Sequence, residues 1–170
     1  MTLKPGIRQL PNPSVEIKRL GYSAFFMPKR LYLDSNVFIS FVREEIDSAF
    51  NLRFLDSENF FAVCKNKKHV LLISNWFLSE VGKIACLDKK AISEEFERHG
   101  VNAIFIQEKI DFSSVSRIAK QTGLHYADAL HVSIALENKA DFIVTWNIRD
   151  FEKASALIKA VSPNEILDTL

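Results

Sequence analysis

The chain has 170 residues and a net charge of +1, with 48% hydrophobic and 25% charged residues. This composition fits one globular domain and excludes a disordered or collagen-like chain, and no apolar run reaches the roughly 20 residues that cross a membrane. The charge is uneven, because residues 1–30 carry six basic residues and one acid, whereas the other 140 residues carry a net charge of −4.

The first 29 residues differ in composition from the rest, since four of the five prolines fall before residue 29. Proline removes a backbone donor and fixes φ, so we expect residues 1–29 to form an extended basic arm, with a short ordered piece around 15–26. Residues 30–170 are expected to form one domain. There is no apolar leader, and Cys64 and Cys86 lack metal-binding spacing, so we expect a cytoplasmic protein without a membrane partner.

Short apolar runs that end in polar residues predict buried strands. The predicted strands are 31–33, 69–73, 101–106, 142–145 and, at the end of the chain, 156–161. The predicted helices are 37–41, one or two within 44–64, 75–87, 88–100, 111–122, 124–139 and a short one after 162. Ser74 and Asp88 are candidate N-caps, and Gly100 and Gly123 are candidate helix ends.

Alternating strands and helices predict right-handed crossovers and a parallel sheet covered on both faces. The expected fold class is therefore α/β, a three-layer α/β/α sandwich with four or five parallel strands. In such sheets, ligands bind beyond the carboxyl ends of the strands.

Three acids are predicted to meet at that edge. Asp34 directly follows the first strand, Glu80 lies in the helix after the second strand, and Asp128 opens the most apolar helix. Each has an ordinary explanation alone, as a helix cap, a partner of Lys83, or a charge at a helix N-terminus. Together they would repel one another unless a pKa rises or a cation binds, and oxygen ligands suit Mg²⁺ or Mn²⁺. The residues alone thus indicate a divalent-metal phosphodiesterase.

The segments LYLDSNVFI, SNWFLSEVGK, YADALHVSIAL and FIVTWNIRDF occur in this order along the chain. Together they resemble the signature segments of the PIN-domain ribonucleases, among which the VapC-type toxins are abundant small members. The resemblance covers roughly residues 30–162. It implies a PIN-like fold, hydrolysis of RNA with Mg²⁺ or Mn²⁺ as cofactor, an antitoxin protein as a partner, and a homodimer.

The resemblance also implies roles for single residues. Asp34, Glu80 and Asp128 match the three catalytic acids that hold the metal. Thr145 matches the Thr or Ser that ends the fourth strand. The family often has a fourth acid two residues later, where this chain has Asn147.

Asn147 and Asp150 are both candidates for the metal site, where Asp150, three residues after Asn147, either replaces the missing acid or only orients the loop. Ser35 and Asn36 match the small polar residues after the first Asp, and the helix that they open could meet phosphate. His125 and His131 flank Asp128 at i−3 and i+3. We expect both to be packed rather than to bind metal, because hard cations prefer oxygen.

The leading functional hypothesis is a VapC-like endoribonuclease toxin, with the basic arm guiding RNA toward the acids. An RNA-processing PIN nuclease outside a toxin–antitoxin pair, and a degenerate PIN-like module that binds RNA or protein, are the alternatives. A phosphatase with Asp34 as nucleophile would need an acid at position 36, where Asn36 stands. A receiver domain would need paired acids and a late Lys that we do not find.

Overall fold

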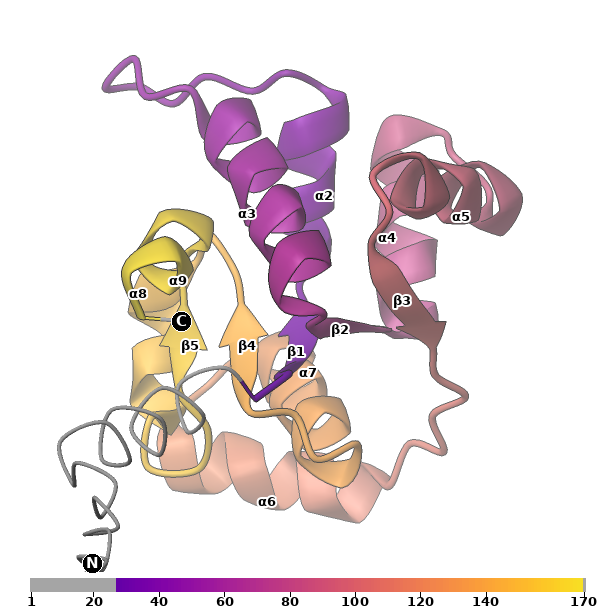
Figure 1. Ribbon diagram of the computed structural model, residues 1–170. Helices are drawn as coiled ribbons and strands as arrows, with labels where there is room; N and C mark the ends of the chain where they lie inside the picture. The colour runs from indigo at the N-terminus through magenta and orange to yellow at the C-terminus, as the bar shows by residue number, and fades with distance from the viewer. Residues whose placement is uncertain (1–26, 170) are drawn as a thin grey trace, which may run out of the picture.

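The structure, a computed structural model, describes residues 27–169, with side chains described as far as residue 166. Its centre is a parallel sheet of strand order β3-β2-β1-β4-β5, with β1 in the middle (Figure 1). The strands are β1 (Arg30–Leu33), β2 (Val70–Ile73), β3 (Asn102–Phe105), β4 (Phe142–Val144) and β5 (Ala160–Val161). The predicted α/β class and parallel sheet are confirmed.

Helices connect successive strands. They are α2 (Ser35–Val42), α3 (Arg53–Lys67), α4 (Asn75–Ala85), α5 (Lys89–Arg98), α6 (Phe112–Thr122), α7 (Tyr126–Glu137), α8 (Ile148–Phe151) with a 3₁₀ turn (Glu152–Ala154), and α9 (Pro163–Thr169). The predicted caps are confirmed, since the Ser74 hydroxyl accepts from Phe77 N–H and Asp88 accepts from Ala91 N–H. Gly123 ends α6 with a φ of 72°, a conformation that glycine adopts without strain.

The sheet is buried on both faces because its strands alternate between two apolar cores. Leu31 and Leu33 of β1 belong to a core shared with α2, α3, α4, α5 and α9. Tyr32 faces the other side and belongs to a core shared with α6, α7 and α8. These cores make the three layers of the predicted sandwich, with α2 and α3 on one side of the sheet and α6 and α7 on the other (Figure 1).

Three stretches differ from the sequence-based expectation, and the third is the last strand, which was expected over 156–161 and spans only Ala160–Val161. The first is the loop that precedes α3, where the Asp47 carboxylate accepts from Ala49 N–H and Asn51 N–H. Such local bonds compete with the helix ladder, so α3 begins only at Arg53. The second is the four-residue helix α8, at a place where no helix was predicted. The expected ordered piece at 15–26 lies outside the described residues.

The arm joins the body at the amino end of the sheet. Lys29 N–H donates to His69 Nδ1 (3.0 Å), and Val70 N–H donates to the Lys29 carbonyl (2.8 Å). Because the strands are parallel, the acids after β1 lie at the opposite edge, about 13 Å away over four residues. The expected guiding role of the arm therefore requires it to turn back along the body. Among the described helices, none combines the length and apolar character needed to cross a bilayer.

Candidate metal centre

Asp34 stands at the carboxyl end of the central strand. Its backbone N–H donates to the Val144 carbonyl (3.0 Å), which ties the end of β1 to β4. Asp34 occupies the N-cap position of α2, but its side chain accepts no capping hydrogen bond. It is nevertheless buried, with 6% of its surface exposed. Capping therefore does not explain why this carboxylate is buried. Its hydrogen bonds are made with other groups.

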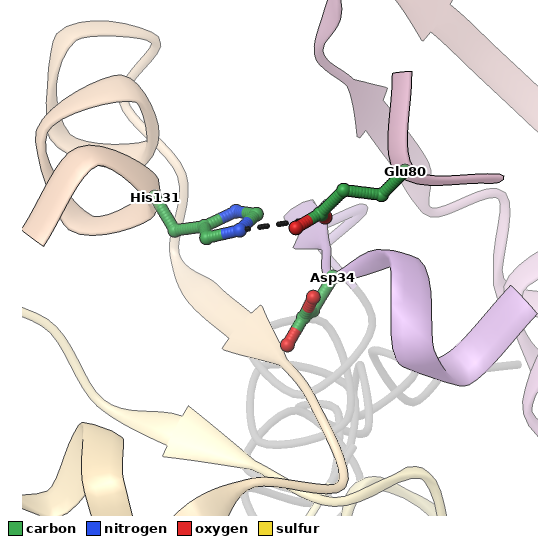
Figure 2. Close-up of side chains that lie close together, drawn as sticks. All are labelled: Asp34, Glu80 and His131. Carbon is green, nitrogen blue, oxygen red and sulfur yellow. Dashed lines mark ion pairs between the residues drawn. The ribbon is translucent and has the colours of Figure 1, made fainter. Parts of the chain in front are cut away.

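Three side chains from separate elements converge at this point (Figure 2). Asp34 precedes α2, Glu80 lies on α4, and His131 lies on α7. One ligand-capable atom from each of them lies within 4.8 Å of the others. The sheet brings them together because the helices that follow β1 and β2 start at the same edge, where α7 also packs.

The Asp34 carboxylate is held through one of its oxygens. Thr145 Oγ1 donates to Oδ2 at 2.6 Å, and Asn36 Nδ2 donates to the same oxygen at 2.8 Å. Asn36 in turn accepts from Trp146 N–H (3.1 Å), which fixes the amide orientation. Within residues 27–166, no hydrogen bond occupies Oδ1, so one oxygen of a buried carboxylate is available to a cation.

Glu80 is held by the residue after Asp34. Ser35 Oγ donates to Glu80 Oε2 at 2.7 Å, and His131 Nε2 lies 3.7 Å from the same oxygen. Lys83, the partner expected for a surface acid, forms no ion pair with Glu80 in the described part of the chain. Ser35, Asn36 and Thr145 thus support the site by orienting its two acids.

Asp128, the third predicted acid, lies outside the group of three. It is half-buried in the first turn of α7. Burial raises its pKa above the ordinary value, nearby His131 opposes this, and the charges of Asp150 and Asp34 raise it further. Asp128, Asp150 and Asp34 therefore lie near enough to one another for their negative charges to interact.

Asn147 is placed by Thr145, whose Oγ1 accepts its backbone N–H at 3.0 Å. It occupies the N-cap position of α8, but its side chain makes no capping bond. Within residues 27–166, its side-chain amide makes no hydrogen bond. Asp150 lies in the first turn of α8.

The two histidines behave differently. His131 is buried between Tyr32 and Phe151, as packing predicts, with ring centroids 5.7 and 6.2 Å away. It also faces the acids, which was not predicted. The i+3 spacing from Asp128 was the sequence signal that His131 shares a helix face with an acid. Which acid the ring faces depends on how α7 packs. His125 is exposed, so its predicted packing is wrong.

The donor set suits an oxygen-preferring divalent cation, because it concentrates carboxylates, one of them buried, with unused oxygens. Burial, followed by nearby carboxylates such as Asp34, raises the pKa of Tyr32 well above its ordinary value. The phenol thus stays neutral and adds no further negative charge. A cation would offset the repulsion between Asp34 and Glu80.

Comparison with known proteins identifies the fold. The model of a PIN domain family matches residues 30–149. Among 13 matching chains of solved structures, the crystal structure of PAE2754 from Pyrobaculum aerophilum is 18% identical, covering 83% of this chain and 95% of that one with a TM-score of 0.46. No curated protein matches the chain. PIN domains are generally nucleases, and they typically use divalent metals. The matched segment contains the whole edge from Asp34 to Asn147, and the chain belongs to the PIN-domain family.

Proposed function

We propose that this protein is an endoribonuclease that hydrolyses RNA phosphodiester bonds with Mg²⁺ or Mn²⁺. The observation that carries the proposal is the state of Asp34. Its carboxylate is buried, one oxygen takes two hydrogen bonds, and the other is left open beside Glu80. Within residues 27–166, Asp34 makes no capping bond and no ion pair, and such a buried carboxylate is costly unless it binds a cation.

Asp34, Glu80 and Asp128 would hold the cation, with Asn147 and Asp150 as outer oxygen donors. When bound, the cation would lower the pKa of water and offset charge on the phosphate. The chain's own contribution is positioning. Thr145 and Asn36 hold the carboxylate plane of Asp34, and Ser35 holds that of Glu80.

The first turn of α2 adds a second contribution. Its first N–H groups point toward the edge where the acids lie, and free N–H groups at a helix N-terminus attract phosphate. Ser35 and Asn36 open this helix. They would therefore serve the phosphate through their backbone while their side chains orient the acids.

We further propose that the activity is that of a VapC-like toxin in the cytoplasm, with an antitoxin protein as partner and a homodimer as assembly. An RNA-processing PIN nuclease outside a toxin–antitoxin pair uses the same chemistry. Growth arrest on expression of the wild type, but not of Asp34→Asn, supports the toxin. Normal growth combined with full cleavage in vitro supports RNA processing.

The nuclease itself is tested by cleavage of a structured RNA in Mg²⁺ or Mn²⁺. We expect Asp34→Asn and Glu80→Gln each to lower cleavage at least 100-fold, since each removes a charge from the centre. Glu58→Gln is the matched control, because Glu58 is exposed on α3. Equal cleavage by the wild type and all three variants would refute the assignment, as would cleavage that EDTA leaves unchanged.

A further inference from the structure

His131 presents to the acids a nitrogen that makes no hydrogen bond within residues 27–166. The residue is 4% exposed, and its Nδ1 lies 2.8 Å from the Tyr32 hydroxyl. Its other nitrogen, Nε2, faces Glu80 across 3.7 Å, which is too long for a hydrogen bond (Figure 2). Over the part of the chain that the structure describes, Nε2 has no hydrogen-bond partner.

Whether Nε2 carries a proton follows from a buried chain of hydroxyl groups. Phe77 N–H donates to Ser74 Oγ at 2.9 Å, so that oxygen already acts as an acceptor. Ser74 is fully buried, and within residues 27–166 the acceptor in reach of its own proton is the Tyr32 hydroxyl, at 3.0 Å. If Ser74 donates to Tyr32, then Tyr32 must donate its single proton to His131 Nδ1.

This direction satisfies every group in the chain. Nδ1 accepts, so the neutral imidazole of His131 carries its proton on Nε2. The reverse direction would leave the Ser74 proton without an acceptor in the core, which buried hydroxyl groups avoid. The donors and acceptors of Ser74 and Tyr32 alone select this tautomer.

For Nε2 to bind a metal, its proton would have to move to Nδ1, which would reverse the hydroxyl chain and leave the Ser74 proton without an acceptor. We propose that His131 is not a ligand of the cation, and that its Nε2–H is instead the hydrogen-bond donor for a phosphate oxygen of the substrate. Glu80 Oε2 is an alternative acceptor, but at 3.7 Å from Nε2 it lies beyond hydrogen-bond distance. An N–H in a group of carboxylates is the complement of an anionic ligand that arrives with the cation. This inference rests on the proposed nuclease function for the identity of that anion.

The claim that His131 does not bind the cation is tested on the full chain with Mn²⁺. We expect calorimetry to give His131→Asn a dissociation constant within about 3-fold of the wild type, whereas Asp34→Asn loses binding. Pulsed electron paramagnetic resonance of the Mn²⁺-loaded wild type should show no coupling to a directly bound nitrogen. Such a coupling, or a loss of affinity in His131→Asn as large as in Asp34→Asn, would overturn the proposal.

The claim that His131 Nε2–H donates to phosphate is tested by ¹⁵N nuclear magnetic resonance of the histidine side chains in the presence of Mg²⁺. We expect His131 to show a proton on Nε2, and added inorganic phosphate to shift this signal while leaving exposed His125 unchanged. A proton on Nδ1, or a signal that phosphate does not move, would overturn the assignment. Tyr32→Phe should weaken the preference for Nε2–H, because it removes the donor to Nδ1.

Cleavage by conservative variants separates donation from packing. Gln places its amide near the position of Nε2, whereas Asn places it near Nδ1. We expect His131→Asn to lower kcat about 10- to 100-fold, the effect of one hydrogen bond to a charged group, and His131→Gln to recover part of it. His125→Gln is the control. If the two His131 variants lose equal activity, the ring only packs and the donor role is wrong.

Failure of this inference differs from failure of the proposed function. If the wild type binds Mn²⁺ and cleaves no RNA, the nuclease is refuted, while the resonance experiments still decide the role of His131. If the wild type cleaves RNA and nitrogen coupling appears, the nuclease stands and His131 is a ligand.

Discussion

Asp34→Asn should make the metal-free protein more stable. In the wild type, carboxylate oxygens of Asp34 and Glu80 lie within 4.8 Å of each other. At an effective dielectric constant of about 20, two such charges repel by about 3 kcal/mol. Glu80 is partly exposed, so solvent screening reduces this to about 1–2 kcal/mol.

The substitution is well matched to the site. The new amide oxygen can accept from Thr145 and Asn36 as Oδ2 does, while the amide nitrogen takes the open position. The hydrogen bonds are kept and the charge is removed. For a chain of this length, the expected gain raises Tm by about 2–8 °C in EDTA.

Mn²⁺ should reverse the order. A ligand at 100 times its dissociation constant stabilises the folded state by about 2.7 kcal/mol, and only the wild type gains this. Scanning calorimetry in EDTA and in Mn²⁺, with Glu58→Gln as control, measures both effects. A lower Tm for Asp34→Asn than for the wild type in EDTA, or an equal rise of both Tm values with Mn²⁺, would contradict a repulsion between Asp34 and Glu80 that a cation relieves.

Three further predictions follow from individual contacts. Thr145→Val should cost about 1.5–3 kcal/mol in urea unfolding and lower RNA cleavage, because it removes a 2.6 Å donor to a buried carboxylate, whereas Thr145→Ser should retain both. Burial first, and then neighbouring acids, raises the folded pKa of Asp128 above 3.8, so the folded state binds the proton more tightly. The metal-free wild type should therefore lose stability relative to Asp128→Asn as pH rises from 3.8 through that folded pKa; parallel pH profiles of the two proteins would contradict this. Deleting residues 1–26, which contain four basic residues, should reduce the salt slope of RNA binding by at most about 3; an unchanged slope would exclude phosphate contact by the arm.

Local chemistry made much of the fold predictable. Ser74 and Asp88 are caps in the structure because a side-chain oxygen satisfies orphan N–H groups wherever it precedes a helix. The loop before α3 was not predictable in the same way. There the Asp47 carboxylate offers the backbone a competing set of bonds, and its advantage over a helix depends on packing.

The sequence by itself determined that Asp34 and Glu80 share one edge of the sheet. Apolar runs locate the strands, and parallel pairing then brings their carboxyl ends together. It did not determine the partners of these acids. Thr145 lies 111 residues from Asp34, and the hydrogen bond between them exists because β1 and β4 pair in register.

Only the tertiary structure decided that His131, rather than Asp128, completes the tight group with Asp34 and Glu80. Both residues lie on one face of α7, so their spacing alone cannot separate them. The rotation of α7 against the sheet separates them, because it buries His131 against Tyr32 and leaves Asp128 half-buried. The same rotation aims Nε2 at the acids, since a helix buried on most sides has a single orientation that fills its core.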